Sequence, residues 1–124
     1  METNTPAAES KDSPFVKELL EKDFDAEVLK ATLPVVVDFY SAESAPCKAL
    51  QPRYGAVAEK FDGKVRFFKV LREGHAPLSA SWKVTASPTL VFFKDGKETG
   101  ERLTGDDIKR TALKAQVDAM LKTP

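Results

Sequence analysis

The chain has 124 residues, of which 42% are hydrophobic and 31% are charged, a balance typical of one folded domain and not of a disordered chain. Lys and Arg together number 19, as do Asp and Glu, so there is no basic excess for binding nucleic acid. The longest unbroken apolar stretch, Leu90–Phe93, is far shorter than the roughly 20 residues of a membrane-spanning helix, so we expect no membrane association.

Residues 1–14 contain two prolines and few apolar side chains, so we expect a disordered N-terminal tail followed by a folded domain over residues 15–124. Neither a positively charged start nor a run of about 7 to 15 apolar residues is present, and we therefore expect no export signal. The single cysteine, Cys47, cannot form an internal disulfide. Both observations fit a cytoplasmic location.

The first elements of the domain are short. Phe15–Leu20 fits a strand or a helical turn, and we favour the strand. Asp23 is expected to cap a following helix, because Asp is a good N-cap and acidic residues stabilise the first turn. The apolar residues of that helix are Phe24, Val28 and Leu29.

Val35–Tyr40 is a β-branched and aromatic run without alternation, which is typical of a central strand covered on both faces. The helix expected after it contains Pro52, which should kink it, and is closed by Gly63. Its apolar residues recur at spacings of three and four, as on one helical face; they are Cys47, Leu50, Tyr54, Val57 and Phe61.

The second half of the domain continues the alternation. Val65–Leu71 is predicted to be a strand that completes a right-handed βαβ unit, and Ala76–Trp82 to be a short helix. A β-hairpin is expected from Thr89–Phe93 and Lys97–Leu103, because Asp95–Gly96 between them suits a tight two-residue turn.

A last helix is predicted after Gly105, with Asp106 or Asp107 as its cap. Its buried stripe is expected to contain Ile108, Ala112, Leu113, Ala115, Val117, Ala119 and Met120. The order of strands and helices along the chain predicts an α/β domain.

The stretch Val35–Pro52 places a buried strand before a helix whose first turn carries the one cysteine, and reads V-V-V-D-F-Y-S-A-E-S-A-P-C-K-A-L-Q-P. It resembles the thioredoxin family, whose pattern is V-D-F-W-A-x-W-C-G-P-C-K followed by a proline inside the helix. Lys69, Ser87–Thr89 and Lys94–Gly96 resemble the strand lysine, the cis-proline segment and the hairpin turn of that family. The resemblance extends from about Phe15 to Leu121 and implies a thioredoxin fold, with a mixed central sheet flanked by helices on both faces.

The first cysteine of the family pattern is replaced by Ser44. A hydroxyl does not ionise near neutral pH and cannot be oxidised to a disulfide, so the two-electron dithiol cycle is chemically unavailable to this chain alone. We expect Ser44 to be the N-cap of the helix, accepting a hydrogen bond from the backbone N–H of Cys47, rather than a nucleophile. Glu43 and Ala45 replace the tryptophan and glycine of the pattern and alter the surface that would face a substrate.

Two interpretations of Cys47 stay open. It is either a small buried hydrophobic residue or a reactive thiol that the helix N-terminus activates. Asp38 lies among apolar residues, which should raise its pKa. The resemblance implies that Asp38, with Lys69 nearby, assists proton transfer to Cys47; the alternative is that the pair survives only as a buried polar contact.

The resemblance also implies a cis bond between Ser87 and Pro88, which would leave the backbone of Ser87 free to pair with an extended substrate strand beside Ser44 and Pro46. The sequence S-P-T alone would favour an ordinary trans proline at the start of a strand. Trp82 is expected in the core, and His75 is expected to be a solvated loop residue.

Two functions are consistent with these residues. The first is monothiol thiol–disulfide exchange through Cys47 with partner proteins or peptides or with low-molecular-weight thiols such as glutathione, an oxidoreductase-like activity without the first cysteine. The second is a redox-inactive binding module or chaperone-like holdase that uses the groove near Ser44, Pro46 and Pro88. No metal cluster, phosphate-binding glycine loop or nucleotide motif is present in the sequence, so no cofactor or metal is implied.

Overall fold

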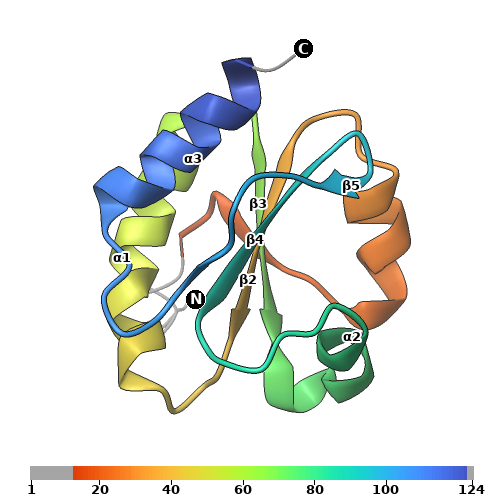
Figure 1. The fold of residues 1–124 in the computed structure, drawn as a ribbon, viewed down its shortest axis with the longest axis vertical. Coiled ribbons are helices and arrows are strands. Elements are labelled where there is room, and N and C mark those ends of the chain that lie inside the picture. The colour runs from red at the N-terminus through yellow and green to blue at the C-terminus, as the bar shows by residue number, and fades with distance from the viewer. Residues whose placement is uncertain (1–12, 123–124) are drawn as a thin grey trace, which may run out of the picture.

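The computed structural model describes residues 13–122, so the predicted tail lies outside the described residues except for Ser13 and Pro14. Figure 1 shows the chain as a sheet with helices on either side. The elements are β1 (Val16–Glu18), η2 (Glu21–Asp23), η3 (Asp25–Leu29), β2 (Val35–Tyr40), α1 (Ala45–Lys60), β3 (Arg66–Leu71), η4 (Arg72–Gly74), α2 (Ala76–Ser81), β4 (Thr89–Lys94), β5 (Lys97–Glu98), β6 (Leu103–Thr104) and α3 (Arg110–Lys122). Within residues 13–122, none of these helices has the length and apolar character to cross a membrane.

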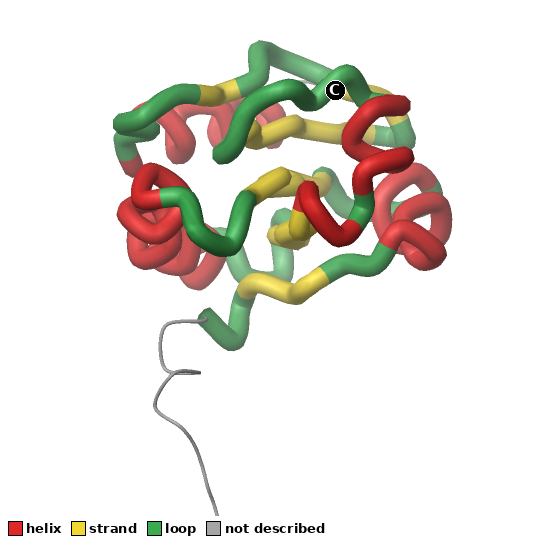
Figure 2. Tube along the Cα trace, turned by 90° about the horizontal axis from the view of Figure 1, so that it is seen from below, coloured by secondary structure: helices red, strands yellow, loops and turns green. Residues whose placement is uncertain are grey.

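The sheet is mixed, as the resemblance implied. Its strand order is β1-β3-β2-β4-β5, with β6 paired to β4. β1 and β2 run parallel to β3, whereas β4 runs antiparallel to β2. The helices α1 and α3 cover one face, and η3 and α2 cover the other (Figures 1 and 2). The predicted α/β fold is therefore confirmed, with β2 as the central strand.

The central strand β2 is buried on both faces, which explains its unbroken apolar sequence. Val36 packs with residues of α1 and α3, whereas Val35, Val37 and Phe39 pack in the cluster under η3 and α2. Because side chains alternate along a strand, Asp38 lies on the Val36 side and faces the helix that carries Cys47.

The helix α1 is joined to the sheet by Tyr54. Its buried hydroxyl lies 3.1 Å from the Val36 carbonyl oxygen and 2.7 Å from the Phe68 carbonyl oxygen, so it contacts both β2 and β3. At the next residue, Gly55, an added Cβ would lie 2.8 Å from the Cβ of Ser13, so the absence of a side chain lets the segment before β1 approach the helix. Tyr54 therefore fixes the position of α1 on the sheet, and Gly55 allows the segment before β1 to lie close to the helix.

The first helical segment differs from the prediction. Asp23 is the last residue of the 3₁₀ helix η2, and the following turn has Phe24 as its N-cap without a side-chain cap, so the predicted capping role of Asp23 was wrong. The burial of Phe24 and Val28 in the core accounts for this segment instead. The predicted strand before it is confirmed but is shorter, over Val16–Glu18.

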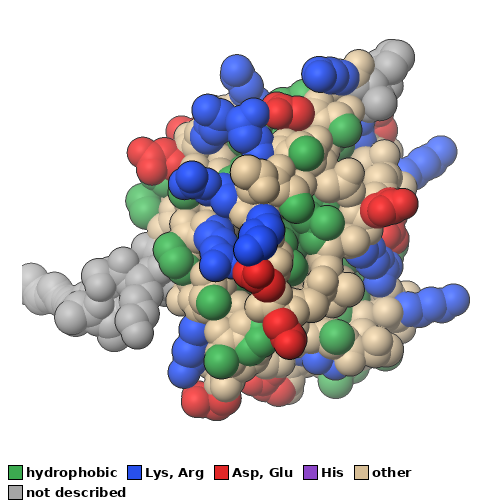
Figure 3. Space-filling view, turned by 60° about the vertical axis from the view of Figure 1, so that its left-hand side comes forward, with side chains coloured by type: hydrophobic (Ala, Val, Ile, Leu, Met, Phe, Trp, Pro, Cys, Tyr) green, Lys and Arg blue, Asp and Glu red, His purple; other side chains and the backbone are tan. Residues whose placement is uncertain are grey.

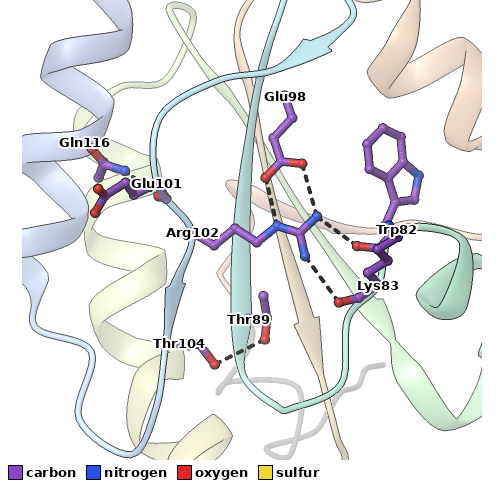
Figure 4. A network of polar contacts seen from close by, with 8 residues as sticks. All are labelled: Trp82, Lys83, Thr89, Glu98, Glu101, Arg102, Thr104 and Gln116. Atoms are coloured by element: carbon purple, nitrogen blue, oxygen red, sulfur yellow. Dashed lines mark hydrogen bonds and ion pairs between the residues drawn. The ribbon is translucent and has the colours of Figure 1, made fainter.

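The second arm of the predicted hairpin is broken. Lys97–Glu98 and Leu103–Thr104 pair with β4 as separate strands, so a continuous strand over Lys97–Leu103 was wrong. In Figure 4 the guanidinium of Arg102 lies between Glu98, which accepts at 2.7 Å, and the Trp82 carbonyl, which accepts at 2.8 Å. These polar contacts compete with strand pairing in the intervening residues and tie the hairpin to the chain after α2.

The last helix starts later than predicted, at Arg110, so neither Asp106 nor Asp107 is its cap. Instead, Arg53 donates to the Asp107 carboxylate at 3.1 Å and to the Ile108 carbonyl at 3.0 Å, which stabilises this stretch in a non-helical conformation.

Figure 3 shows the face formed by α1 and α3, where basic and acidic side chains lie side by side.

The predicted stripe of α3 is only partly correct. Leu113, Val117 and Met120 are buried, and so is Ile108 just before the helix. The alanines Ala112, Ala115 and Ala119 are exposed. Since alanine is a strong helix former that loses little on exposure, its spacing alone does not identify a buried face.

Candidate active site

Cys47 lies in the first turn of α1. Its backbone N–H donates to the Ser44 hydroxyl at 3.3 Å, which confirms Ser44 as the N-cap, and Pro46 occupies the first turn. The side chain of Cys47 is only 5% exposed. Its Sγ accepts a hydrogen bond from the backbone N–H of Ser41 at 3.4 Å. This donor and the helix N-terminus both stabilise negative charge on the sulfur.

Replacing Ser44 by alanine should lower the free energy of unfolding by about 1 kcal/mol, because the hydroxyl that caps α1 is lost. Urea denaturation measures this change. The exposed Ala45 offers a matched control, since Ala45→Ser adds a hydroxyl one residue later and should leave the stability nearly unchanged. Equal stability of Ser44→Ala and the wild type would contradict the capping role.

Asp38 is 6% exposed and lies beneath the start of α1. Burial raises its pKa from 3.8 to about 7; the positive charge of Lys69 opposes this rise and the negative charge of Glu18 adds to it. The predicted rise is therefore confirmed. The Oδ1 atom of Asp38 has no hydrogen-bond partner among the described residues. A carboxyl group of this kind can hold or release a proton near neutral pH.

Lys69 lies beside Asp38, as the resemblance implied, because the two residues are partners in the parallel pairing of β2 and β3. The Lys69 ammonium lies 3.9 Å from a carboxylate oxygen of Glu18 and 5.4 Å from the ring centre of Tyr40. The Tyr40 hydroxyl in turn donates to Glu18 at 2.8 Å. The ammonium group of Lys69 on β3 is therefore held beside Asp38 by contacts from β1 and β2.

The peptide bond between Ser87 and Pro88 is cis, as the resemblance implied. The hydroxyl of Ser87 accepts from Arg72 at 2.8 Å and from the Ser41 hydroxyl at 2.9 Å. Ser41 therefore contacts both the proline loop and the Cys47 sulfur. Neither Ser41 nor Arg72 was predicted from the sequence, although each directly follows the end of a strand.

A cleft of about 730 Å³ opens beside Cys47, on the side of Asp38 and Lys69. It lies between the segment Ser13–Phe15 and the outer turns of α1. The structure therefore brings together the three residues predicted to be catalytic. The residues predicted to bind substrate are not among those that line the cleft; they are Ser44, Pro46, Ser87 and Pro88.

Trp82 and His75 lie outside this site. The ring of Trp82 packs at 5.8 Å from Phe24 and 5.1 Å from Phe93, so it lies against the core as predicted but is only partly buried. His75 precedes α2 and is half-buried, with Nδ1 at 3.1 Å from the Leu71 carbonyl oxygen. Among residues 13–122, no group of three or more His, Cys, Asp or Glu side chains could hold a metal ion.

The fold and the site together define a thioredoxin-like protein, and comparison with known proteins agrees. The Thioredoxin family model matches residues 15–119. A thioredoxin of Peptoclostridium acidaminophilum is 37% identical over 88% of this chain and 94% of its own length. A thioredoxin of Acetoanaerobium sticklandii is 39% identical over 83% of this chain and 94% of its own length. Thioredoxin X, a chloroplastic protein of Arabidopsis thaliana, is 33% identical over 87% of this chain, which spans 59% of that relative. The chain belongs to the thioredoxin family.

Proposed function

We propose that this thioredoxin-like protein carries out monothiol thiol–disulfide exchange through Cys47. Membership of the family supports a thioredoxin-like redox function and protein disulfides as the general class of substrate. The observation that carries the monothiol mechanism is the position of the Cys47 sulfur. It accepts a hydrogen bond from the Ser41 N–H and lines the same cleft as the Asp38 carboxyl.

The exchange balances with one cysteine on the protein, one external disulfide and one external thiol. The ionised Asp38 takes the proton of the Cys47 thiol, and the resulting thiolate attacks a disulfide. A bond forms between Cys47 and one sulfur, while the other leaves as a thiolate and receives the proton from Asp38. An external thiol then attacks the mixed disulfide and forms a new external disulfide, while Cys47 leaves as a thiolate and takes up the proton of that thiol. Lys69 acts on Asp38 through its charge.

The groove formed by Ser44, Pro46, Ser87 and Pro88 is proposed to receive the chain of a protein partner, with glutathione as a low-molecular-weight alternative. The contact of Ser41 with both Ser87 and Cys47 supports this placement, since it connects the proline loop to the sulfur. We also propose a cytoplasmic location, because the reducing conditions there would keep the thiol of Cys47 available for exchange.

Incubation with oxidised glutathione should add one glutathione to the native protein, and the Cys47→Ala variant should show no adduct in the intact mass. Asp38→Asn should slow the reaction and remove the step near pH 7 from its pH profile, because asparagine cannot accept the proton. A wild-type protein that forms no adduct under native conditions, either with oxidised glutathione or with a small neutral disulfide, would overturn the proposal.

The burial of Cys47, at 5% exposure, favours the second candidate function, a redox-inactive binding module. In that case Cys47→Ala would bind a partner protein as tightly as the wild type does. The two functions therefore differ in one variant: monothiol exchange requires the sulfur, and the binding module does not.

A further inference from the structure

The cleft beside Asp38 has the size and lining of a small-molecule site. Its volume of about 730 Å³ falls within the range of roughly 300 to 1,000 Å³ that is typical of ligand pockets. Pro14 and Phe15 form one side, and Pro52 and Ala56 of α1 form the other. The walls are therefore largely apolar, as in most pockets for organic molecules.

Polar groups meet at one end of this cleft. Asp38 is almost entirely buried, with an exposed fraction of 6%, and its Oδ1 has no hydrogen-bond partner among residues 13–122. A buried oxygen without a partner is unfavourable, and this oxygen is itself closed to solvent; a ligand that donates to it once the carboxyl turns toward the cleft would gain affinity. Cys47 lines the same cleft. A donor group and a reactive sulfur of one small molecule would thus meet two side chains of the protein.

The charges around the cleft are mixed. Lys48 and Lys69 line it together with Asp38 and Glu59, so neither sign dominates. Lys48 and Glu43 are largely exposed, with side-chain exposures of 61% and 94%, and belong to the outer surface. This arrangement favours a neutral ligand over a strongly anionic or cationic one.

We propose that the cleft is a second route to Cys47, separate from the groove proposed for protein partners, and that it admits small neutral disulfides with a hydroxyl or amide donor a few atoms from the sulfur. This inference rests on the proposed monothiol function and narrows its substrate class. Donation to Asp38 Oδ1 positions the disulfide, the Cys47 thiolate forms the new bond to the nearer sulfur, and the farther sulfur leaves as a thiolate that is then protonated.

The probe is 2-hydroxyethyl disulfide, which is neutral and carries a hydroxyl near each sulfur. The rate at which it forms a mixed disulfide with Cys47 is followed by intact mass. Ala56→Phe places a ring in the apolar cleft and should slow the reaction about tenfold. Ala49→Phe is the matched control, because Ala49 is exposed on the same helix, nearer Cys47, and does not line the cleft. It should change the rate by less than about twofold.

A second pair of measurements does not depend on the added ring. Phe15→Ala widens the opposite wall and should speed the reaction at least about threefold. For the wild type, diethyl disulfide lacks the donor and should react at least about fivefold more slowly than the hydroxyl compound, once each rate is divided by that of a free thiol.

The outcomes separate the route from the chemistry. If the adduct forms at equal rates in the wild type, Ala56→Phe and Phe15→Ala, the cleft is not the route, although monothiol exchange stands. If the two disulfides react equally, the role of Asp38 in binding is overturned. If no adduct forms in the wild type with either 2-hydroxyethyl disulfide or oxidised glutathione, both the inference and the proposed function fail. Near-ultraviolet circular dichroism confirms that each variant is folded.

Discussion

The Asp38→Asn variant should be more stable than the wild type at pH 8 by up to about 4 kcal/mol, since each unit of pKa shift corresponds to about 1.4 kcal/mol. Burial raises the pKa of Asp38 from 3.8 to about 7. Between these two values the unfolded chain is ionised while the folded chain keeps its proton, so stability falls as the pH rises. The loss is complete above about pH 7, where the folded protein holds a buried charge.

Urea denaturation at pH 3, 6 and 8 measures the effect. At pH 3 the wild type and the variant should have nearly equal free energies of unfolding, because Asp38 is then largely protonated in both the folded and the unfolded chain. Asp107→Asn is a control of opposite sign, because Lys109 and Arg53 lower the pKa of this exposed carboxyl. Its removal should slightly reduce stability at pH 8. Equal stability of Asp38→Asn and the wild type at pH 8 would show that Asp38 is not an unfavourable buried charge.

Ser44→Cys should restore the two-electron dithiol chemistry that the wild type lacks. The Ser44 hydroxyl already lies 3.3 Å from the backbone nitrogen of Cys47 in the first turn of the helix, which places the two side chains close together. The reagent is excess dithiobis(2-nitrobenzoate), a symmetrical disulfide whose cleavage releases a coloured thiolate. Each reduced wild-type chain should release one of these thiolates and keep the other half of the reagent in a mixed disulfide with Cys47. The variant should release two and keep none, because the introduced thiol displaces the bound half.

Absorbance gives the number of released thiolates, and intact mass gives the retained group. Ser44→Ala is the matched control: it lacks the hydroxyl in the same way but should release one thiolate and retain one half, as the wild type does. A Ser44→Cys protein that keeps the mixed disulfide would show that the two positions are too far apart to exchange. The restored chemistry would then need more than one substitution.

The central strand and the site helix could be predicted because local signals and tertiary packing agree there. The run Val35–Tyr40 has the composition of a doubly covered strand, and Ser44 is both a good N-cap and the residue that the fold places before α1. At Asp23 and Asp107 the same capping signal misled, because burial of neighbouring side chains and the contact with Arg53 decided the backbone.

The candidate site was predicted only in part. The pairing of Asp38 with Lys69 follows from the register of two adjacent parallel strands, and the family resemblance indicated it. The link from Arg72 through Ser87 to Ser41 joins loops far apart in the sequence, and no periodic pattern marks it. The cleft depends on the approach of Ser13 to α1, which only the folded chain reveals.

That approach is possible because Gly55 has no side chain. A methyl group at this position would lie 2.8 Å from the Cβ of Ser13, closer than two such carbons can pack. The width of the opening therefore depends on the absence of a Cβ at this buried position of the helix. A side chain added here, as in Gly55→Ala, would displace Ser13 and change the shape of the entrance without any alteration of the thiol or of the carboxyl beneath it.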